Sequence, residues 1–371
     1  MTQIKHWLND SIYTNSLSPG CKMCAEGAKM VVFITGLCPA YCFYCPLSLK
    51  KTNTDVIFAD EWQLTNENDT DKLTKEALFI KAKGAGITGG DPLTKWERTN
   101  KYIQILKKIF GHSFHIHLYT SGLEHIDHIE NLVDSGLNEI RFHPSPNYWN
   151  NMDKSKVKKA IFLVQKMAVD TAIEIPAIPN MKKDIIKLIH WADIHDIDWI
   201  NLNELELSER NEKELYKRGF FSKNDVSSAV LHSQFDAYDI IQTIADESLP
   251  IGIHYCSSSF KDGIQLKNRI KRRAESIANP FDIITDEGTL LKGIIYVKNI
   301  KKIPDIISYL KTEFHLSEKE YIVSYDKKTI QVSIPFLESI AYTLSTSEYE
   351  CYISESYPTA DELEVERIPL R

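Results

Sequence analysis

The sequence predicts an α/β protein built on a parallel sheet, followed by a smaller α+β domain. From Val31 onward, short apolar runs alternate with longer amphipathic runs, and this alternation stops near Pro280. Regular strand–helix alternation is typical of parallel strands with helices packed outside them. Six or seven such units predict a full or partial barrel, with an open doubly wound sheet as the alternative.

The elements of the first domain follow from the period and length of the apolar runs. The predicted strands are Met30–Thr35, Gly84–Thr88, His115–Thr120, Glu139–His143, Thr171–Ile178, Trp199–Leu202 and Ile251–Tyr255. The predicted helices are Asp71–Lys83, Lys95–Phe110, Glu124–Ser135, Lys154–Ala168, Lys183–His195 and Val226–Asp246.

The remainder of the chain has a different pattern. A hairpin is expected around an Asp-Glu-Gly turn, and helices and strands of an α+β domain follow it. We therefore expect an N-terminal extension over residues 1–30, a barrel over 31–278 and a small domain over 279–371. The predicted elements of the small domain are Phe281–Thr285, Leu290–Val297, Pro304–Phe314, Tyr321–Tyr325, Thr329–Pro335, Phe336–Ser345 and Glu350–Ser354.

Composition narrows the class of protein. The formal net charge of −7 argues against a surface that coats nucleic acid, although basic residues between Lys267 and Arg273 leave nucleic-acid binding open. No apolar run is long enough to span a bilayer and no signal peptide is evident, so we expect a cytoplasmic protein without membrane contact. Five of the seven cysteines fall between Cys21 and Cys45. In the cytosol such clusters more often bind metal or perform redox chemistry than form disulfides.

The most informative segment is the loop after the first barrel strand. It carries Cys38, Cys42 and Cys45 at the spacing Cys-x3-Cys-x2-Cys. A four-iron cluster usually takes four thiolate ligands, so three leave one iron open for an exogenous ligand. A zinc site completed by distant ligands is the alternative.

This loop resembles that of the radical S-adenosylmethionine superfamily. The resemblance implies a partial (βα)6-type barrel and a [4Fe-4S] cluster held by the three cysteines. It further implies that S-adenosylmethionine binds the open iron and is reductively cleaved to a 5′-deoxyadenosyl radical for hydrogen abstraction. Tyr44, the aromatic residue before the third cysteine, is then expected beside the adenine. A one-electron donor such as ferredoxin or flavodoxin is the expected partner.

A second landmark follows the second barrel strand. Gly89-Gly90-Asp91-Pro92 resembles the Gly-Gly-Glu-Pro of that family, where backbone and carboxylate meet the methionyl amino group. Asp91 is one methylene shorter than the usual Glu, which weakens the expected carboxylate contact, whereas the glycines still allow close approach of the backbone. An ordinary strand-to-helix turn is the alternative.

Further cosubstrate contacts are expected at the ends of the next strands. Thr120 and Ser121 are similar in position to the Asp-Thr-Asn-Gly region of glycyl-radical activating enzymes. Arg141, His143 and Glu174 are candidates on the fourth and fifth strands, because barrel enzymes build active sites at strand ends. For these residues the alternative is a satisfied polar group inside the barrel.

Other cysteines and histidines allow additional metal sites. Cys21 and Cys24 form a Cys-x2-Cys pair, and with Cys256 they are candidates for an auxiliary iron–sulfur cluster, the alternatives being a redox couple or unligated thiols. His115 and His117 share one face of a strand, so a metal pair is conceivable. No third ligand at a known spacing accompanies them, and this favours ordinary buried histidines.

From Gly20 to the end of the barrel, the chain also resembles a largely archaeal group related in name to pyruvate formate-lyase activating enzymes. The shared motifs are Gly-Cys-x2-Cys-x2-Gly-Ala-Lys and Thr-Gly-Leu-Cys-Pro. The likeness names no substrate. We therefore expect a radical enzyme with an unknown substrate. The alternatives are an enzyme acting on a macromolecule (a glycyl-radical protein or tRNA) and an iron–sulfur or zinc scaffold, which would not need the Gly89–Asp91 turn.

Overall fold

The computed structural model describes residues 2–344 and 348–370, so that Ser345, the last residue of one predicted helix, lies outside them. The chain divides into two compact units, Met1–Leu266 and Lys267–Arg371. The change of sequence pattern near Asn279 lies beyond this division, because helix α10 (Lys267–Ile277) belongs to the second unit. Among the described residues, no helix is long and apolar enough to cross a membrane.

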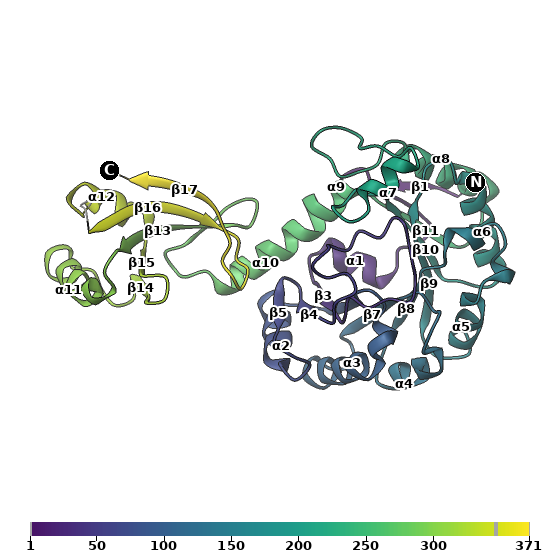
Figure 1. Cartoon of the computed structure of the whole chain (residues 1–371), viewed down its shortest axis with the longest axis horizontal. Coiled ribbons are helices and arrows are strands. Elements are labelled where there is room, and N and C mark those ends of the chain that lie inside the picture. Colours follow the sequence, from purple (N-terminus) through teal and green to yellow (C-terminus); the bar gives the residue numbers. More distant parts are fainter. Residues whose placement is uncertain (1, 345–347, 371) are drawn as a thin grey trace. The chain divides into compact units, whose positions relative to one another are not determined.

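The first unit is a partial barrel of parallel strands (Figure 1). Its sheet has eleven strands in the order β1-β2-β11-β10-β9-β8-β7-β6-β3-β4-β5. The seven strands from β11 to β3 are parallel, and short antiparallel strands flank both ends of this run, so β3 does not pair with β11. The predicted fold class is therefore confirmed. The parallel strands are β3 (Lys29–Phe33), β6 (Gly84–Thr88), β7 (His115–Thr120), β8 (Glu139–Phe142), β9 (Asp170–Ala177), β10 (Trp199–Glu204) and β11 (Gly252–Cys256).

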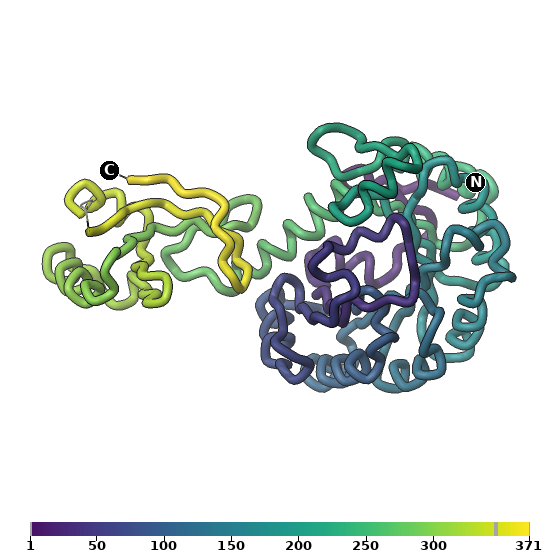
Figure 2. Tube along the Cα trace, in the orientation of Figure 1, coloured from purple at the N-terminus to yellow at the C-terminus, as the bar shows by residue number. Residues whose placement is uncertain are grey.

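Helices surround the barrel, and one short helix lies inside it. Helix α1 (Pro19–Ala25) lies within the ring of strands and contacts β3, β6 and β7 (Figures 1 and 2). Apolar residues of the strands and outer helices form one continuous core. The outer helices are α2 (Thr70–Phe79), α3 (Trp96–Phe110), α4 (Ile129–Asp134), α5 (Val157–Val164), α6 (Lys182–Ile194), α7 (Glu212–Lys217) and α8 (Ser233–Glu247).

Smaller elements complete the first unit, and the sequence patterns did not indicate most of them. They are too short to develop a clear periodicity. The strands are β1 (Ile4–His6), β2 (Ile12–Thr14), β4 (Ile57–Ala59) and β5 (Trp62–Leu64). The helical pieces are 3-10 turns at Pro92–Lys95, Ile126–His128, Pro146–Tyr148 and Met152–Lys154, helix α9 (Ser258–Phe260), and a π-helical segment at Lys261–Leu266.

Strand register sets which side chains share the barrel interior. His117 on β7 lies between Gly86 on β6 and Glu139 on β8. One row nearer the strand starts, Gly84 separates Lys29 from His115. Because side chains two residues apart point to the same face of a strand, these polar groups all project inward. The interior is therefore polar, whereas the outward face of the sheet packs against the helices.

The second unit is an antiparallel sheet with two helices on one face. The sheet order is β14-β15-β13-β16-β17, with β12 paired to β13. Apolar residues of β13, β15 and β16 pack against α11 and α12. The opposite face carries a hollow of about 530 Å³ that Lys292, Tyr296, Tyr352 and Arg367 help to line. The elements are β12 (Ile283–Ile284), β13 (Leu290–Val297), a 3-10 turn (Ile300–Lys302), α11 (Ile303–Phe314), β14 (Tyr321–Ser324), β15 (Thr329–Val332), α12 (Ile334–Leu344), β16 (Tyr349–Ser356) and β17 (Glu364–Leu370).

Candidate active site

The loop after β3 presents three thiols at the carboxyl end of the parallel strands. Cys38, Cys42 and Cys45 are all partly exposed, and the tip of the loop at Tyr41 is 96% exposed. The backbone N–H of Ala40 donates to Cys38 Sγ over 3.4 Å. Partly exposed thiols can hold a metal and still let a small molecule reach it.

Burial keeps two thiols of this loop protonated when no metal is bound. Burial raises the pKa of Cys38 to about 12, and burial also raises the pKa of Cys42. Both groups are therefore neutral thiols unless a metal replaces the proton. Three sulfur donors on one short loop fit a four-iron cluster with one iron left for another ligand.

The glycine turn after β6 is fastened to the cysteine loop by main-chain hydrogen bonds. The N–H of Gly90 donates to the carbonyl oxygen of Thr35 over 2.7 Å, and that of Asp91 donates to Leu37 over 2.8 Å. A Cβ added to Gly90 would lie 2.3 Å from the carbonyl oxygen of Leu37. The close approach that this glycine allows is thus to the cysteine loop itself.

Asp91 links this turn to the end of β7. Its Oδ1 accepts from Thr120 Oγ1 at 2.9 Å and from the N–H of Leu93 at 3.1 Å. Its Oδ2 accepts from the Oγ and the N–H of Ser121 at 2.5 and 3.0 Å. The carboxylate is buried, and burial raises its pKa in spite of these bonds. Asp91 therefore positions Thr120 and Ser121, the two other predicted site residues at this edge.

Tyr44 is held at the mouth of the barrel by a hydrogen bond between side chains. Its hydroxyl lies 2.9 Å from Nε2 of His143, whose Nδ1 lies 2.6 Å from the carbonyl oxygen of Glu174. Burial raises the pKa of Tyr44 well above its usual value, so the phenol stays neutral. The structure thus joins two predicted site residues, Tyr44 and His143, in one chain of contacts.

Two sets of residues that the sequence motifs did not reveal also hold the cysteine loop. Arg98 of α3 donates to the carbonyl oxygen of Ile34 over 2.8 Å and forms a bidentate pair with Asp55 at 2.7 and 3.1 Å. On the other side, Asn211 donates to the carbonyl oxygen of Tyr44 over 2.9 Å. Arg210 likewise donates to the carbonyl oxygen of Cys45 over 3.2 Å. These contacts join segments far apart in the sequence, so no local sequence motif predicts them.

Arg141 and Glu174 lie deeper, in a buried network inside the barrel. The guanidinium of Arg141 donates to Glu139 at 2.6 Å, to Glu174 at 2.7 Å and to Ser18 of the α1 N-terminus at 2.7 Å. Glu174 also accepts from Asn201 at 3.0 Å. The sequence allowed two interpretations of Arg141 and Glu174: contact with the cosubstrate, or a structural role as polar residues that hydrogen-bond one another inside the barrel. These contacts favour the structural role.

The remaining cysteine candidates lie around α1 and the end of β11. Cys21 and Cys256 are buried, and Cys24 is partly buried. Burial would raise the pKa of Cys21, but the charge of Arg141 and a hydrogen bond from His254 lower it to about 6. Burial raises the pKa of Cys256, and the charges of Cys21 and Cys24 add to this effect. The three thiols therefore share one electrostatic neighbourhood.

Comparison with known proteins agrees with this geometry. Residues 32–192 match the radical SAM superfamily, and residues 288–370 match a family described only as a domain of unknown function. A putative glycyl-radical enzyme activating enzyme of Methanocaldococcus jannaschii is 39% identical over 387 residues, which cover 99% of this chain and 96% of the relative.

Two solved structures match part of this chain. Streptococcus suis SuiB bound to precursor peptide SuiA has a TM-score of 0.45 at 11% identity, covering 64% of this chain and 51% of that one. The radical S-adenosylmethionine methyltransferase TsrM from Kitasatospora setae has a TM-score of 0.36 at 9% identity, covering 68% and 52%. This chain thus spans about half the length of these two proteins. From the relative at 39% identity and the matched superfamily segment, the chain belongs to the radical S-adenosylmethionine superfamily and is a radical enzyme that uses an iron–sulfur cluster and S-adenosylmethionine.

Proposed function

We propose that Cys38, Cys42 and Cys45 are the three ligands of the catalytic [4Fe-4S] cluster, and that S-adenosylmethionine binds at the open iron. This proposal rests on the position of the three half-buried thiols beside the strand ends. Main-chain hydrogen bonds join their loop to the turn at Gly90. In a parallel barrel, strand ends are where ligand sites are built.

The residues around the thiols have separate tasks in this site. When bound, the cluster supplies one electron to the sulfonium of S-adenosylmethionine, which releases the 5′-deoxyadenosyl radical that abstracts hydrogen from the substrate. Gly89 and Gly90 let the turn lie directly against the cysteine loop, and Asp91 fixes the hydroxyls of Thr120 and Ser121. Tyr44, anchored through His143, forms the wall assigned to the adenine.

Spectroscopy of the reduced protein tests the ligand assignment. The full chain is reconstituted anaerobically with iron and sulfide and reduced with dithionite, and its electron paramagnetic resonance spectrum is recorded before and after S-adenosylmethionine. The wild type should show a reduced-cluster signal that changes on addition of the cosubstrate. Cys42→Ala should lose this response, whereas Cys351→Ala, which changes a buried thiol of the second unit, should keep it. A full response in Cys42→Ala contradicts the assignment.

We further propose that Cys21, Cys24 and Cys256 hold an auxiliary cluster. Their shared electrostatic neighbourhood supports this grouping, since charge on Cys21 and Cys24 raises the pKa of Cys256. With four irons per cubane, the reconstituted wild type should bind about eight irons per chain, and the double variant Cys21→Ser/Cys24→Ser about four. Four irons in both proteins would make these cysteines structural or redox groups.

A second candidate function concerns the substrate. The relative at 39% identity is named a putative glycyl-radical enzyme activating enzyme, and this supports a protein substrate for the present chain as well. Anaerobic incubation with a glycyl-radical protein from the same source should then produce a glycyl-radical resonance. If that protein carries deuterated glycine, one deuterium should appear in the 5′-deoxyadenosine. Deuterium transfer from labelled tRNA instead would assign a nucleic-acid substrate and contradict the activase function.

We assign recruitment of the substrate to the second unit, because the candidate residues of the cosubstrate site all fall in the first unit. The hollow on its sheet face offers the rings of Tyr296 and Tyr352, and Arg367 lies 4.1 Å from the centre of the Tyr352 ring. Tyr352→Ala should keep basal cosubstrate cleavage and lose substrate turnover. Tyr309→Ala, on the exposed side of α11, is the matched control. Loss of basal cleavage in Tyr352→Ala would refute this division of tasks.

A small one-electron carrier, ferredoxin or flavodoxin, is the proposed reductant. The exposed loop tip at Tyr41 offers such a carrier a short approach to the thiols. Reduced flavodoxin should therefore replace dithionite in the cleavage reaction. Cleavage that proceeds with dithionite but with neither carrier would contradict this choice of donor.

A further inference from the structure

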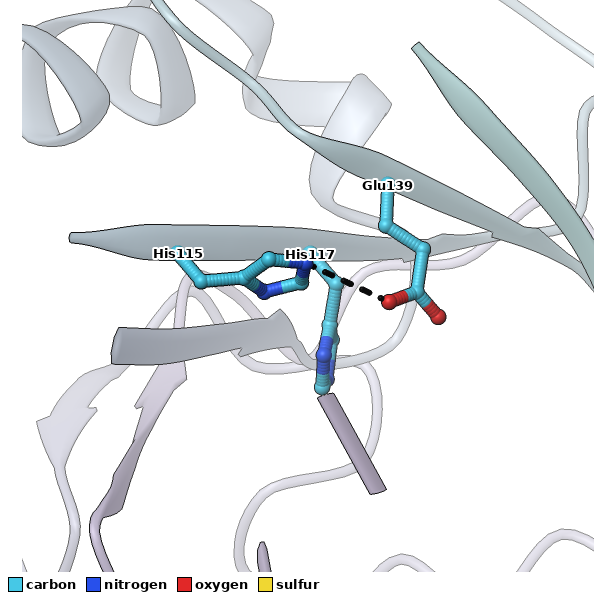
Figure 3. A group of neighbouring side chains, drawn as sticks. All are labelled: His115, His117 and Glu139. Atoms are coloured by element: carbon cyan, nitrogen blue, oxygen red, sulfur yellow. Dashed lines mark ion pairs between the residues drawn. The ribbon is translucent and has the colours of Figure 1, made fainter. Parts of the chain in front are cut away.

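Three buried side chains converge inside the barrel, near the starts of β7 and β8 (Figure 3). His117 and Glu139 are register partners on the two strands, and His115 lies two residues before His117 on the same face. One ligand atom from each residue lies within 4.8 Å of the other two. The register therefore supplies the carboxylate that sequence spacing alone did not show.

Each of these side chains has a polar atom without a hydrogen-bond partner. Those atoms are Nε2 of His115, Nδ1 of His117 and Oε2 of Glu139, all fully shielded from solvent. His115 Nε2 lies 3.6 Å from Glu139 Oε2, too far for a hydrogen bond. A buried polar atom left unpaired is costly, and one ion or water molecule between these three atoms would satisfy them together.

Two glycines bring the backbone of α1 and β6 close to these side chains. A Cβ on Gly20 of α1 would lie 2.6 Å from Nδ1 of His117, 2.7 Å from Nη2 of Arg141 and 3.1 Å from Oε2 of Glu139. A Cβ on Gly86 of β6 would lie 2.6 Å from Nε2 of His117. A side chain at either position would displace the imidazole, so the two glycines allow His117 its position beside Glu139.

Neighbouring charged groups orient the three side chains. Arg141 occupies Oε1 of Glu139 at 2.6 Å, which turns Oε2 toward the histidines. Lys29 Nζ lies 2.6 Å from Nδ1 of His115, which turns Nε2 toward Glu139. Burial lowers the pKa of His115 to about 3 and that of His117 well below its usual value, so both rings are neutral.

We propose that His115, His117 and Glu139 bind one divalent transition-metal ion in the barrel interior. Two neutral imidazoles and one carboxylate form a ligand set that such ions occupy in proteins. The ion satisfies all three unpaired atoms and joins β7 to β8 beside Gly20 of α1. Ligation through Nε2 of His115 places the ring proton on Nδ1, and one proton then leaves Lys29, whose pKa burial lowers to about 8, so that its amine accepts from Nδ1.

Zinc analysis of the iron-loaded full-length protein tests this site. Iron first fills the thiol sites, and chelator-treated protein then receives Zn²⁺ and is desalted. We expect about one zinc per chain, with nitrogen and oxygen ligands at about 2.0–2.1 Å in the zinc absorption-edge spectrum. Glu139→Gln and His117→Ala should each reduce bound zinc at least tenfold, with iron unchanged. His112→Ala, which removes a histidine outside the cluster, should retain it.

Gly20→Ala provides a test that removes no ligand. The added methyl group should exclude the ion while leaving the iron content intact, and circular dichroism verifies that each variant is folded. A wild type that binds no zinc overturns the proposal and leaves a water molecule as the common partner. Zinc with sulfur ligands only, or equal zinc in wild type and Glu139→Gln, also overturns it. Iron content reports separately on the cysteine assignments, so failure of one proposal is distinguishable from failure of the other.

Discussion

The two ends of the barrel carry candidate ligand sets of different chemistry, sulfur donors at one end and nitrogen and oxygen donors at the other. At the carboxyl ends of the strands, the thiols of Cys38, Cys42 and Cys45 are half-exposed and are positioned largely by main-chain bonds. Near the amino ends, His117 and Glu139 are buried, and Glu139 is held by the side chain of Arg141. An open, backbone-supported site can admit and release a cosubstrate. A closed site supported by side chains is suited to a permanent occupant or to a structural role.

The largest effect on stability is expected from the buried network. Arg141→Met leaves the carboxylates of Glu139 and Glu174 without their cation and should cost about 3–5 kcal/mol of unfolding free energy. Lys158→Met breaks an exposed pair with Asp153 and should cost less than about 1 kcal/mol. Urea denaturation followed by tryptophan fluorescence measures both, because all six tryptophans precede residue 200 and report on the first unit. Equal costs would show that the interior network is not the stabilising element.

The same contrast explains what could be predicted from the sequence. The cysteine loop and the glycine turn are contiguous motifs directly after strands, so their residues and position were readable without a structure. The partner of His117 was not, because Glu139 comes 22 residues later and reaches it only through strand register. The inward position of α1 was equally hidden, since seven residues are too few to show a packing face.

A smaller effect is expected where the open site is braced by a side chain. Asp91→Asn replaces one of the two acceptor oxygens by a donor that faces Ser121 or Thr120. This change should lower the free energy of unfolding by about 1–3 kcal/mol. The displaced hydroxyls should slow cosubstrate cleavage about tenfold or more. Urea denaturation measures the loss of stability, chromatography of 5′-deoxyadenosine measures cleavage, and iron analysis verifies that the cluster is retained. Asp69→Asn, at the start of α2, is the control and should cleave normally; normal cleavage by Asp91→Asn would remove this residue from the site.

Tyr44→Phe removes the hydroxyl that contacts both His143 and Cys42. The loss of one buried hydrogen bond should lower the free energy of unfolding by about 1 kcal/mol. Cosubstrate cleavage should fall by a few-fold because the ring is no longer held by His143. Cosubstrate KM and turnover are measured separately, and KM should carry most of the change. Tyr41→Phe alters a tyrosine exposed to solvent and should match the wild type. A Tyr44→Phe enzyme that also matches it would show that the contact with His143 does not position the ring.

The smallest effect concerns the outer support of the cysteine loop. A hydrogen bond from Arg98 lowers the pKa of Asp55 from 3.8 to about 2. Because the folded-state pKa is depressed, the pair stabilises the protein above about pH 4, and this contribution is lost as pH falls toward 2. Partial exposure limits it to less than about 1 kcal/mol. In cluster-free protein, the difference in unfolding free energy between wild type and Asp55→Asn should shrink from pH 7 to pH 3. A difference independent of pH would refute the charge contribution.

The most direct test of the central claim is the release of 5′-deoxyadenosine by a single cysteine variant. Wild type, Cys38→Ala and Cys351→Ala are reconstituted anaerobically, reduced, and incubated with S-adenosylmethionine, and the product is quantified by mass spectrometry. Two remaining thiolates cannot hold a cubane firmly, so Cys38→Ala should release no product, whereas Cys351→Ala should equal the wild type. Undiminished release by Cys38→Ala would contradict the assignment of the cysteine loop as the catalytic site.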